Sequence, residues 1–438
     1  MTRVALVVLD TLRKDSFDEH FDWLPGDRFE NAWSPTHWTA PAHASLFTGL
    51  YPGEHGVNSK SLTFNYPGST LVEQLSNDGV TTRAFSTNAY ASPSFRFDRG
   101  FDEFTGDYRM RCRAGHTFDW YTLINDQERG FSRYLAGIRG CIQSENTLES
   151  VKYGLLIKAN EEGLWSPTDS GISEAIQWIR SSSFNDDEFV FANLMEAHSP
   201  YLRLPDEYLP QFGSDTIPDH PTIEHTFKEV NEKHLQEAYD CAVTYLSDRY
   251  RVLFDELIEQ FDYVITVSDH GELLGEYGYF GHNYGLFPEL TQVPVVISTG
   301  NHSGSRSTEL VSLIDIYVTI LDLFGKIPNE SQGRSLVGDN RSEPDAYLTQ
   351  SFGLQTRLLN RVDETFDIAR FDTPLNGVIT TDGYGYETAD EEWIQTNTNK
   401  NLRREMQSLL SGLENSPTRS DSVMDEGTRQ HLEDLGYI

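Results

Sequence analysis

A single threonine, Thr39, stands where a short helix is expected to begin. Threonine is a favourable N-cap residue, Pro41 suits the first helical turn, and Gly49 suits the helix stop. The amide hydrogens of that first turn and the positive end of the helix dipole would face whatever lies beside the Thr39 hydroxyl. This pattern predicts a pocket for a tetrahedral oxyanion.

His43 lies four positions after Thr39, on the same face of the expected helix. An imidazole in that place could order the hydroxyl or a bound anion. The plainer interpretation is an ordinary capped helix with a surface histidine, because caps of this type are common. The helix alone does not decide between the two.

Three short apolar runs are typical of buried parallel strands, and each is followed at once by polar residues. The runs cover residues 4–9, 189–195 and 263–267. They lead into Asp10, into Glu196-Ala197-His198 and into Ser268-Asp269-His270-Gly271. In open α/β sheets the reactive crevice lies beyond the carboxyl ends of the strands, so we expect these polar groups to converge there.

A catalytic threonine needs a partner that lowers the pKa of its hydroxyl, because this group is a poor nucleophile at neutral pH. A divalent cation beside the Thr39 oxygen would do this and would also neutralise an anionic substrate. Asp10, Asp269 and His270 are the candidates to hold that cation. A helix cap and a polar loop are the plainer interpretations of these residues, but three such groups at matching strand ends favour ligation.

Helical patterns lie between the predicted strands. Apolar residues three or four positions apart run from Leu235 to Leu257, and a second apolar helix is expected over 311–324, ending at Gly325. The alternation of strand and helix favours an α/β fold, a doubly wound sandwich with a large, mostly parallel sheet.

The remaining segments predict how the chain is divided. Residues 107–165 show mixed helical character without a strand pattern, and we interpret them as a helical insertion that caps the crevice. A turn-rich linker follows Leu336. We therefore expect a catalytic domain over 1–338 and a small α+β subdomain over 339–438.

The composition excludes one class of partner. The chain of 438 residues has 68 acidic and 34 basic side chains, a formal net charge of −34 that should repel nucleic acid. The charge is spread along the sequence instead of forming a tail. A distributed acidic surface is typical of proteins that stay soluble in concentrated salt, so we expect a halophilic source.

The cysteines and the apolar segments predict where the protein works. Cys112, Cys141 and Cys241 are few, far apart and in no C-x-x-C arrangement, which favours a reducing compartment. No stretch approaches eighteen apolar residues, and the run at 4–9 is too short for a signal segment. We expect a cytoplasmic protein without membrane insertion.

Short motifs occur in a fixed order along the chain. They are Asp10-Thr11-Leu12-Arg13, Thr39-Ala40-Pro41-Ala42-His43, Arg99-Gly100-Phe101-Asp102, His198-Ser199-Pro200-Tyr201, Ser268-Asp269-His270-Gly271-Glu272, Gly333-Arg334-Ser335-Leu336 and Leu435-Gly436-Tyr437. In order and spacing they resemble the sulfatase family of the alkaline phosphatase superfamily, over nearly the whole chain. The resemblance implies the α/β/α sandwich of that superfamily with a small C-terminal subdomain. It also implies ester hydrolysis at a metal held by Asp10, Asp269 and His270, with Thr39 completing the shell.

Two positions depart from the sulfatase pattern. Sulfatases that resemble this chain carry a cysteine or serine, oxidised to formylglycine, where Thr39 stands, and an arginine where His43 stands. Formylglycine hydrate releases sulfate through its second hydroxyl, and threonine has none. Thr-x-Pro-x-His resembles instead the phosphodiesterase and nucleotide-pyrophosphatase branch of the superfamily, where threonine forms a phospho-enzyme. The resemblance thus favours phosphate or phosphonate esters as substrates.

The resemblance also assigns roles to two further histidines and limits the choice of metal. His198 stands where the family places a histidine that contacts the substrate anion, and His282 where many sulfatases have a lysine. Either could be a plain loop histidine, and together they could hold a second metal. Thr11 replaces the second aspartate of the pattern, so Mn²⁺ or Zn²⁺ suits the remaining ligands better than Ca²⁺, which prefers six to eight oxygens. Ca²⁺ and Mg²⁺ stay open as alternatives.

Together these observations predict a hydrolase of small phosphate or sulfate esters that works through a covalent Thr39 intermediate, with His43, His198 and His282 assisting. Three alternatives stay open at this point. They are a sulfuric ester hydrolase that works without formylglycine, a transferase that passes the phospho group to an alcohol, and a non-catalytic relative that binds anions or glycans. The sequence carries no signal for the oligomeric state.

Overall fold

The computed structural model describes residues 1–106, 118, 123, 131–144, 147–161, 169–213, 216–300, 304–338, 344–355, 358, 368–396 and 398–414. Its main feature is an eight-stranded sheet in the order β10-β2-β9-β6-β1-β5-β3-β4. Strand β9 runs antiparallel to both neighbours, and the other adjacent pairs are parallel. The strands are β1 (Thr2–Leu9), β2 (Asp27–Trp33), β3 (Thr81–Ser86), β4 (Glu103–Thr105), β5 (Asp187–Leu194), β6 (Tyr263–Val267), β9 (Val295–Ser298) and β10 (Arg306–Ser312).

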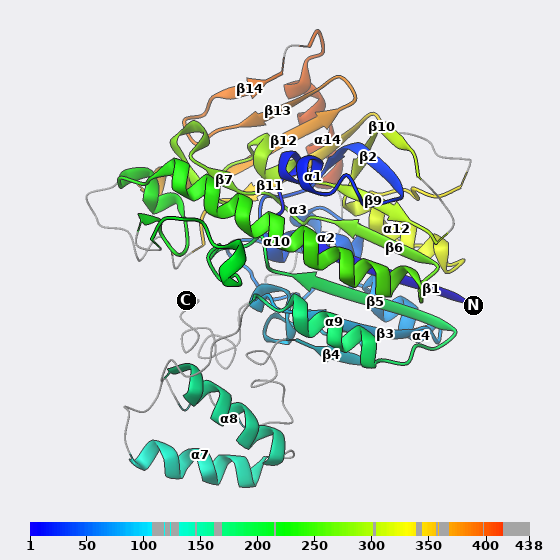
Figure 1. Ribbon diagram of the computed structural model, residues 1–438. Helices are drawn as coiled ribbons and strands as arrows, with labels where there is room; N and C mark the ends of the chain where they lie inside the picture. Colours follow the sequence, from blue (N-terminus) through cyan, green and yellow to red (C-terminus); the bar gives the residue numbers. More distant parts are fainter. Residues whose placement is uncertain are drawn as a thin grey trace.

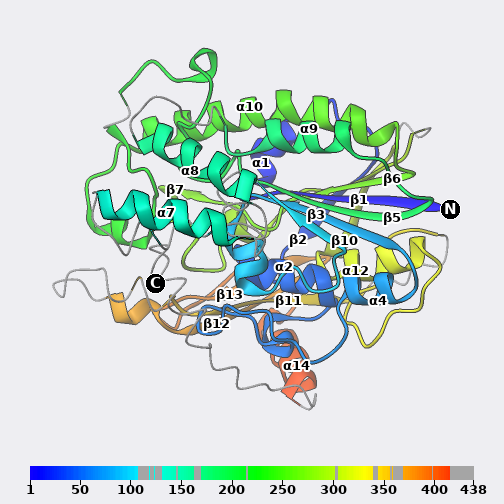
Figure 2. The ribbon, with the colours of Figure 1, turned by 90° about the horizontal axis from the view of Figure 1, so that it is seen from below.

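Helices cover both faces of this sheet (Figures 1 and 2). One layer holds α1 (Lys14–His20), α9 (Ile172–Ser181) and α10 (Glu232–Ile258), and the other holds α2 (Thr39–Thr48), α4 (Leu71–Asn77) and α12 (Ile314–Leu323). Alternate side chains of β1 pack against the two helical layers, because successive strand residues point to opposite faces of the sheet. Val4, Leu6 and Val8 join the core under α2, whereas Ala5, Val7 and Leu9 join the core under α10. The predicted α/β/α sandwich is confirmed.

The three predicted strands are neighbours in the sheet. β1 lies between β5 and β6 and is parallel to both, with Val8 paired to Asn193 on one side and to Val267 on the other. All three therefore end at the same edge. The polar residues that follow them emerge side by side although they come from distant parts of the chain.

The predicted helices are present, with one boundary moved. The apolar face expected over 235–257 is buried in α10. The helix expected over 311–324 begins only at Ile314, because Val311 belongs to β10. An apolar run by itself does not separate a strand end from a helix start. Gly325 adopts the left-handed conformation expected after a helix, with φ of 66°.

A smaller antiparallel sheet follows the main one, in the order β11-β12-β13-β14. Its strands are β11 (Ala346–Phe352), β12 (Pro374–Thr380), β13 (Gly383–Glu387) and β14 (Trp393–Gln395), and α14 (Leu402–Glu414) packs on it. This is the expected small α+β unit, and the domain limits at residues 338 and 339 stay a prediction. The motif Leu435-Gly436-Tyr437 lies outside the described residues.

Shorter elements complete the described chain. Helix α3 (Pro52–His55) follows α2, the hairpin β7 (Leu273–Leu274) and β8 (Phe280–Gly281) follows β6, and α11 (Pro288–Thr291) comes next. Within the predicted insertion, α7 (Phe131–Gln143) and α8 (Thr147–Glu161) form a helical pair (Figure 1). That the insertion caps the crevice stays a prediction.

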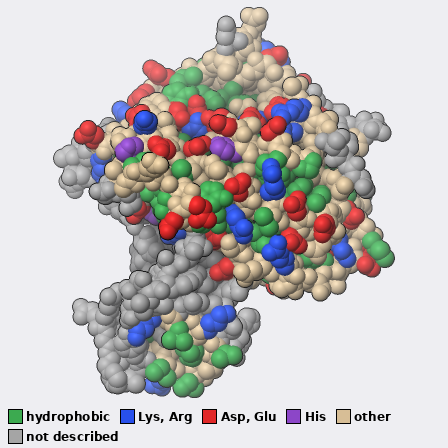
Figure 3. Space-filling view, viewed as in Figure 1, with side chains coloured by type: hydrophobic (Ala, Val, Ile, Leu, Met, Phe, Trp, Pro, Cys, Tyr) green, Lys and Arg blue, Asp and Glu red, His purple; other side chains and the backbone are tan. Residues whose placement is uncertain are grey.

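The distribution of surface charge and the character of the helices relate to two expectations, a distributed acidic surface and no membrane insertion. Acidic side chains are scattered over the face of the molecule drawn in Figure 3 instead of gathering in one cluster. Among the described helices, none combines the length and apolar character needed to cross a bilayer.

Candidate active site

Helix α2 carries the predicted nucleophile, but it starts one residue earlier than a Thr39 cap would require. Trp38 is the N-cap, with an extended backbone, and its carbonyl accepts the first helical hydrogen bond from Ala42 at 3.4 Å. Thr39 is thus the first helical residue and does not cap. Its hydroxyl stays available for contacts outside the helix.

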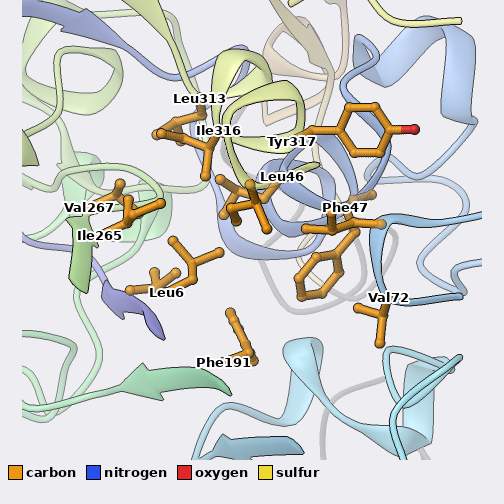
Figure 4. Packing of buried hydrophobic residues seen from close by; sticks show 14 of the residues in the cluster. Leu6, Leu46, Phe47, Val72, Phe191, Ile265, Val267, Leu313, Ile316 and Tyr317 are labelled. Carbon is orange, nitrogen blue, oxygen red and sulfur yellow. The ribbon is translucent and has the colours of Figure 1, made fainter. Parts of the chain in front are cut away.

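The helix is held by burial on every side. All ten of its residues are buried, and Gly49 ends it with φ of 68°. Leu46 and Phe47 lie in the core among Leu6 and Phe191 (Figure 4), and the rings of Phe47 and Phe191 are 5.1 Å apart, edge to face. The position of Thr39 is therefore set by a packed core.

The Thr39 hydroxyl faces two side chains from other elements. Its Oγ1 lies 3.2 Å from Nε2 of His270, which follows β6, and 3.4 Å from Nδ2 of Asn88, which follows β3. Thr39 is only 2% exposed, yet it lines a cavity of about 390 Å³ together with Asn88, His198 and His282. Thr39 is thus part of the cavity wall, and its hydroxyl contacts the fully buried His270.

Behind the hydroxyl lies a cluster of three fully buried groups: Asp10, Asp269 and His270. Each offers one possible ligand atom, and these atoms all lie within 4.8 Å of one another. The adjacency of β1 and β6 brings them together, because Asp10 follows one strand and Asp269 and His270 follow the other. The structure thus assembles the predicted cluster.

The donor atoms of this cluster fit a divalent cation. Oδ2 of Asp269 is buried and has no hydrogen-bond partner in the described part of the chain. Nδ1 of His270 donates to the carbonyl of Gly271 at 2.9 Å, which leaves the lone pair of Nε2 for another partner. Burial lowers the pKa of His270 and keeps the ring neutral, as a ligand must be.

The two carboxylates differ in how their charge is satisfied. Asp10 accepts hydrogen bonds from the Thr11 hydroxyl at 2.8 Å and from the amides of Asn88 and Asn193 at 2.8 and 3.1 Å. Burial, followed by the charge of Asp10, raises the pKa of Asp269 well above its ordinary value. A positive ion between the two would remove that cost, since it favours the ionised form of both.

His43 lies behind the nucleophile and not in the cavity wall. It is fully buried, and its Nδ1 lies 2.9 Å from the main-chain oxygen of Thr39 and 3.6 Å from Oδ2 of Asp269. Burial lowers the pKa of His43 to about 4, so the ring is neutral and Nδ1 donates to the carbonyl. We expected an imidazole near the hydroxyl, and the contact found is with the backbone of the same residue. The catalytic role of His43 stays a prediction.

His198 and His282 lie in the cavity wall, with ring centres 5.1 Å apart. Nδ1 of His282 lies 2.9 Å from Oε1 of the buried Glu272, whose other oxygen accepts a hydrogen bond from the Tyr201 hydroxyl at 2.7 Å. Nδ1 of His198 lies 2.7 Å from the carbonyl of Ser199. Both rings are thus oriented by a neighbour, and both roles stay predictions.

Asn88 and Asn193 belong to the site but are absent from the sequence-based prediction. Asn88 also orders its own loop, since its side chain accepts from the amide of Tyr90 at 2.8 Å. A single asparagine has no diagnostic spacing, so the available signal was its place just beyond a strand. Strand β3 was not among the predicted strands. Asn193 lies inside β5, and the sequence does not show which residue its side chain contacts.

The chain is similar in sequence to proteins of one known family. The sulfatase family model matches residues 22–326, more than half of the chain. An uncharacterised sulfatase of Escherichia coli, YidJ, is 22% identical over 68% of this chain and 60% of its own length. Arylsulfatase K of Xenopus laevis is 24% identical over 71% of this chain and 59% of its own length. The chain thus spans about three fifths of each relative.

Solved structures share the fold. A phosphonate monoester hydrolase from Silicibacter pomeroyi superposes with a TM-score of 0.62 at 16% identity, covering 94% of this chain and 95% of its own. At that identity the likeness concerns the fold alone. On the match to the family model, the chain belongs to the sulfatase family.

Proposed function

We propose that this chain hydrolyses phosphate, phosphonate or sulfate esters through a covalent intermediate on Thr39. The proposal also includes a divalent cation, Mn²⁺ or Zn²⁺ by preference, held by Asp10, Asp269 and His270. One observation carries it: Thr39 lines the cavity, and its hydroxyl lies 3.2 Å from Nε2 of His270, a member of the buried cluster.

The relatives and the residue type support the class of substrate. Their names, arylsulfatase and phosphonate monoester hydrolase, both describe esters of a tetrahedral anion. Threonine has one hydroxyl and no aldehyde, so release of the anion requires water to attack the covalent ester. Formylglycine hydrate avoids this step for sulfate by using its second hydroxyl, so a threonine in that place favours phosphorus esters over sulfate esters here.

The bond changes follow from the groups around Thr39. Its oxygen attacks the phosphorus or sulfur atom as its proton passes to water, and the bond to the leaving alcohol oxygen breaks in line. That oxygen takes a proton from His198. Water then attacks the threonyl ester; one of its protons restores the Thr39 hydroxyl and the other leaves with the released anion. The proton that Thr39 gave to water in the first step returns from the solvent to His198, which restores the starting state.

The surrounding side chains stabilise the charge that develops on the ester oxygens. In this proposal that charge is stabilised by the amides at the start of α2 and by the imidazoles of His198 and His282, which line the same cavity as Thr39. Glu272 holds the His282 ring by its Nδ1. When bound, the cation supplies positive charge that lowers the pKa of a neighbouring hydroxyl and partly neutralises the ester.

The test compares the protein with T39A and with T48A, a matched control at the other end of the same helix. The Thr48 hydroxyl donates to the Ala44 carbonyl in its own helix at 2.7 Å and accepts from the amide of Leu50 at 3.3 Å. Rates are measured on aryl phosphate monoesters, diesters, phosphonates and sulfates, with and without chelator. We expect T39A to lose about 10³-fold or more in kcat/KM and T48A to stay within about tenfold. Mass spectrometry of acid-quenched protein should find the modified peptide around Thr39.

Other outcomes select other functions. Full activity in T39A would show that Thr39 is not the nucleophile. Turnover of sulfates alone would favour a sulfatase without formylglycine, and transfer to an added alcohol in preference to water would indicate a transferase. Binding of anions with no turnover of any ester would indicate a non-catalytic relative.

A further inference from the structure

The cavity beside Thr39 differs in charge from the rest of the chain. Acidic residues outnumber basic ones by 68 to 34 overall, yet none of the described residues that line the cavity is Asp or Glu. The same wall contains Arg203 and three histidines, His198, His220 and His282. The formal charge carried by these described lining residues is positive, which favours an anionic ligand.

Two of these groups exceed what the reaction requires. His198 and His282 have proposed roles at the reacting ester, but Arg203 and His220 do not. Arg203 lies on the segment after β5, where its amide donates to the carbonyl of Pro200 at 3.4 Å. Nδ1 of His220 lies 3.1 Å from Oγ of Ser199, which also lines the cavity. The segment after β5 and the loop at His220 thus form one continuous part of the wall.

The size of the cavity leaves room for more than the reacting group. Its volume of about 390 Å³ falls within the range of about 300–1,000 Å³ typical of sites for small organic ligands. An ester whose reacting group lies at Thr39 therefore extends its alcohol portion into the same cavity, against this wall. A guanidinium there can bind a carboxylate, phosphate or sulfate through two parallel hydrogen bonds.

We propose that Arg203 binds a second anionic group on the leaving alcohol. The preferred substrates are then esters whose alcohol portion itself carries a carboxylate, phosphate or sulfate. This inference depends on the proposed hydrolysis at Thr39, and it names the substrate class of that same site. Arg203 is in this view a specificity-determining residue that contacts the substrate away from the reacting atoms.

The test uses two esters of the same acid that differ only in the second anion: the phenyl ester and the meta-carboxyphenyl ester. The acid is phosphoric, phosphonic or sulfuric acid, according to which esters the protein hydrolyses. We expect kcat/KM to be about tenfold or more higher for the carboxylated ester, mainly through KM. In R203Q this preference should fall about tenfold, and R203K should keep part of it. The control is R306Q, which removes a guanidinium that pairs with Asp22 and Glu30 on the surface and should keep the full preference.

Each failure has a separate reading. If the unaltered protein hydrolyses both esters equally well, or if R203Q weakens both equally, the inference about Arg203 is wrong and the proposed function survives. If the unaltered protein hydrolyses neither ester nor any other member of the panel, the proposed function is wrong and the inference falls with it. R203K separates loss of the guanidinium from a failure of R203Q to fold.

Discussion

At the scale of single residues, the proposed chemistry depends on two carboxylates that are buried side by side. Asp10 has three hydrogen-bond donors, whereas Oδ2 of Asp269 has none among the described residues. Like charges in a dry interior repel strongly, and no residue of the cluster is a lysine or arginine that could balance them. A bound cation is the simplest balance for this pair.

Removing one of these carboxylates should remove the metal. We expect calorimetric titration to detect the binding of Mn²⁺ by the unaltered protein and to detect no binding by D269N. Metal at about a hundred times its Kd stabilises a protein by roughly 2.7 kcal/mol, so a chelator should lower Tm in the unaltered protein and not in D269N.

The matched control for this experiment is D240N. Asp240 is 60% exposed and pairs only with His20 in the described contacts. D240N should bind metal and respond to chelator as the unaltered protein does. Equal metal binding by D269N would show that this carboxylate is no ligand.

Glu196, next to the site, should make stability depend on pH. Its Oε1 accepts from the amide of Ile172 at 2.8 Å, and burial, followed by the charge of Asp169, raises the pKa of Glu196 to about 8. The unfolded chain releases this proton near the ordinary pKa of about 4.3. The contribution of Glu196 to stability is therefore lost progressively as pH rises from there to about 8.

We expect E196Q to resemble the protonated form and to remove this loss. Near pH 8 the variant should be more stable than the unaltered protein by a few kcal/mol, at about 1.36 kcal/mol per unit of pKa difference, and near pH 5 the two should converge. Urea unfolding across this range measures the effect. The exposed Glu207 provides the control, E207Q, which should follow the unaltered profile. Parallel profiles for E196Q and the unaltered protein would contradict the assignment.

At the scale of elements, the position of Thr39 depends on how α2 is packed against the sheet. Phe47 is 2% exposed and contacts Phe97, Phe101 and Phe191. F47A should lower the free energy of unfolding by about 3–5 kcal/mol, because a buried aromatic ring is replaced by a cavity. Chemical denaturation measures this loss. Replacing Leu209, which is 37% exposed, with alanine should cost far less, and a similar cost for both would argue against this core.

At the scale of the whole molecule, the formal charge of −34 is the dominant property. The scattered acidic side chains in Figure 3 repel one another, and salt screens that repulsion over about 10 Å at 0.1 M and about 3 Å at 1 M. We expect Tm to rise steadily with added KCl over this range and beyond. Sucrose at matched osmolality, which screens no charge, is the control.

A Tm that ignores KCl, or that rises equally with sucrose, would contradict the expected adaptation to salt. A halophilic source stays a prediction that depends on the acidic surface. A cytoplasmic location stays a prediction that depends on the few, widely spaced cysteines. The acidic exterior opposes the approach of an anionic ester, whereas the described residues of the cavity wall include Arg203 and neither Asp nor Glu.

The sequence by itself determined the type of fold and the core of the site. Apolar strand runs that end in Asp10, Asp269 and His270, and a helix that starts at Thr39, are local patterns, and local patterns survive without knowledge of the rest of the chain. Only the tertiary structure decided what lies around them. Strand order put Asn88 and Asn193 on Asp10, the packing of α2 on the sheet put His43 3.6 Å from Oδ2 of Asp269, and loop positions brought Arg203 into the cavity wall. These contacts join residues through the order of strands and the packing of helices, which no short sequence window contains.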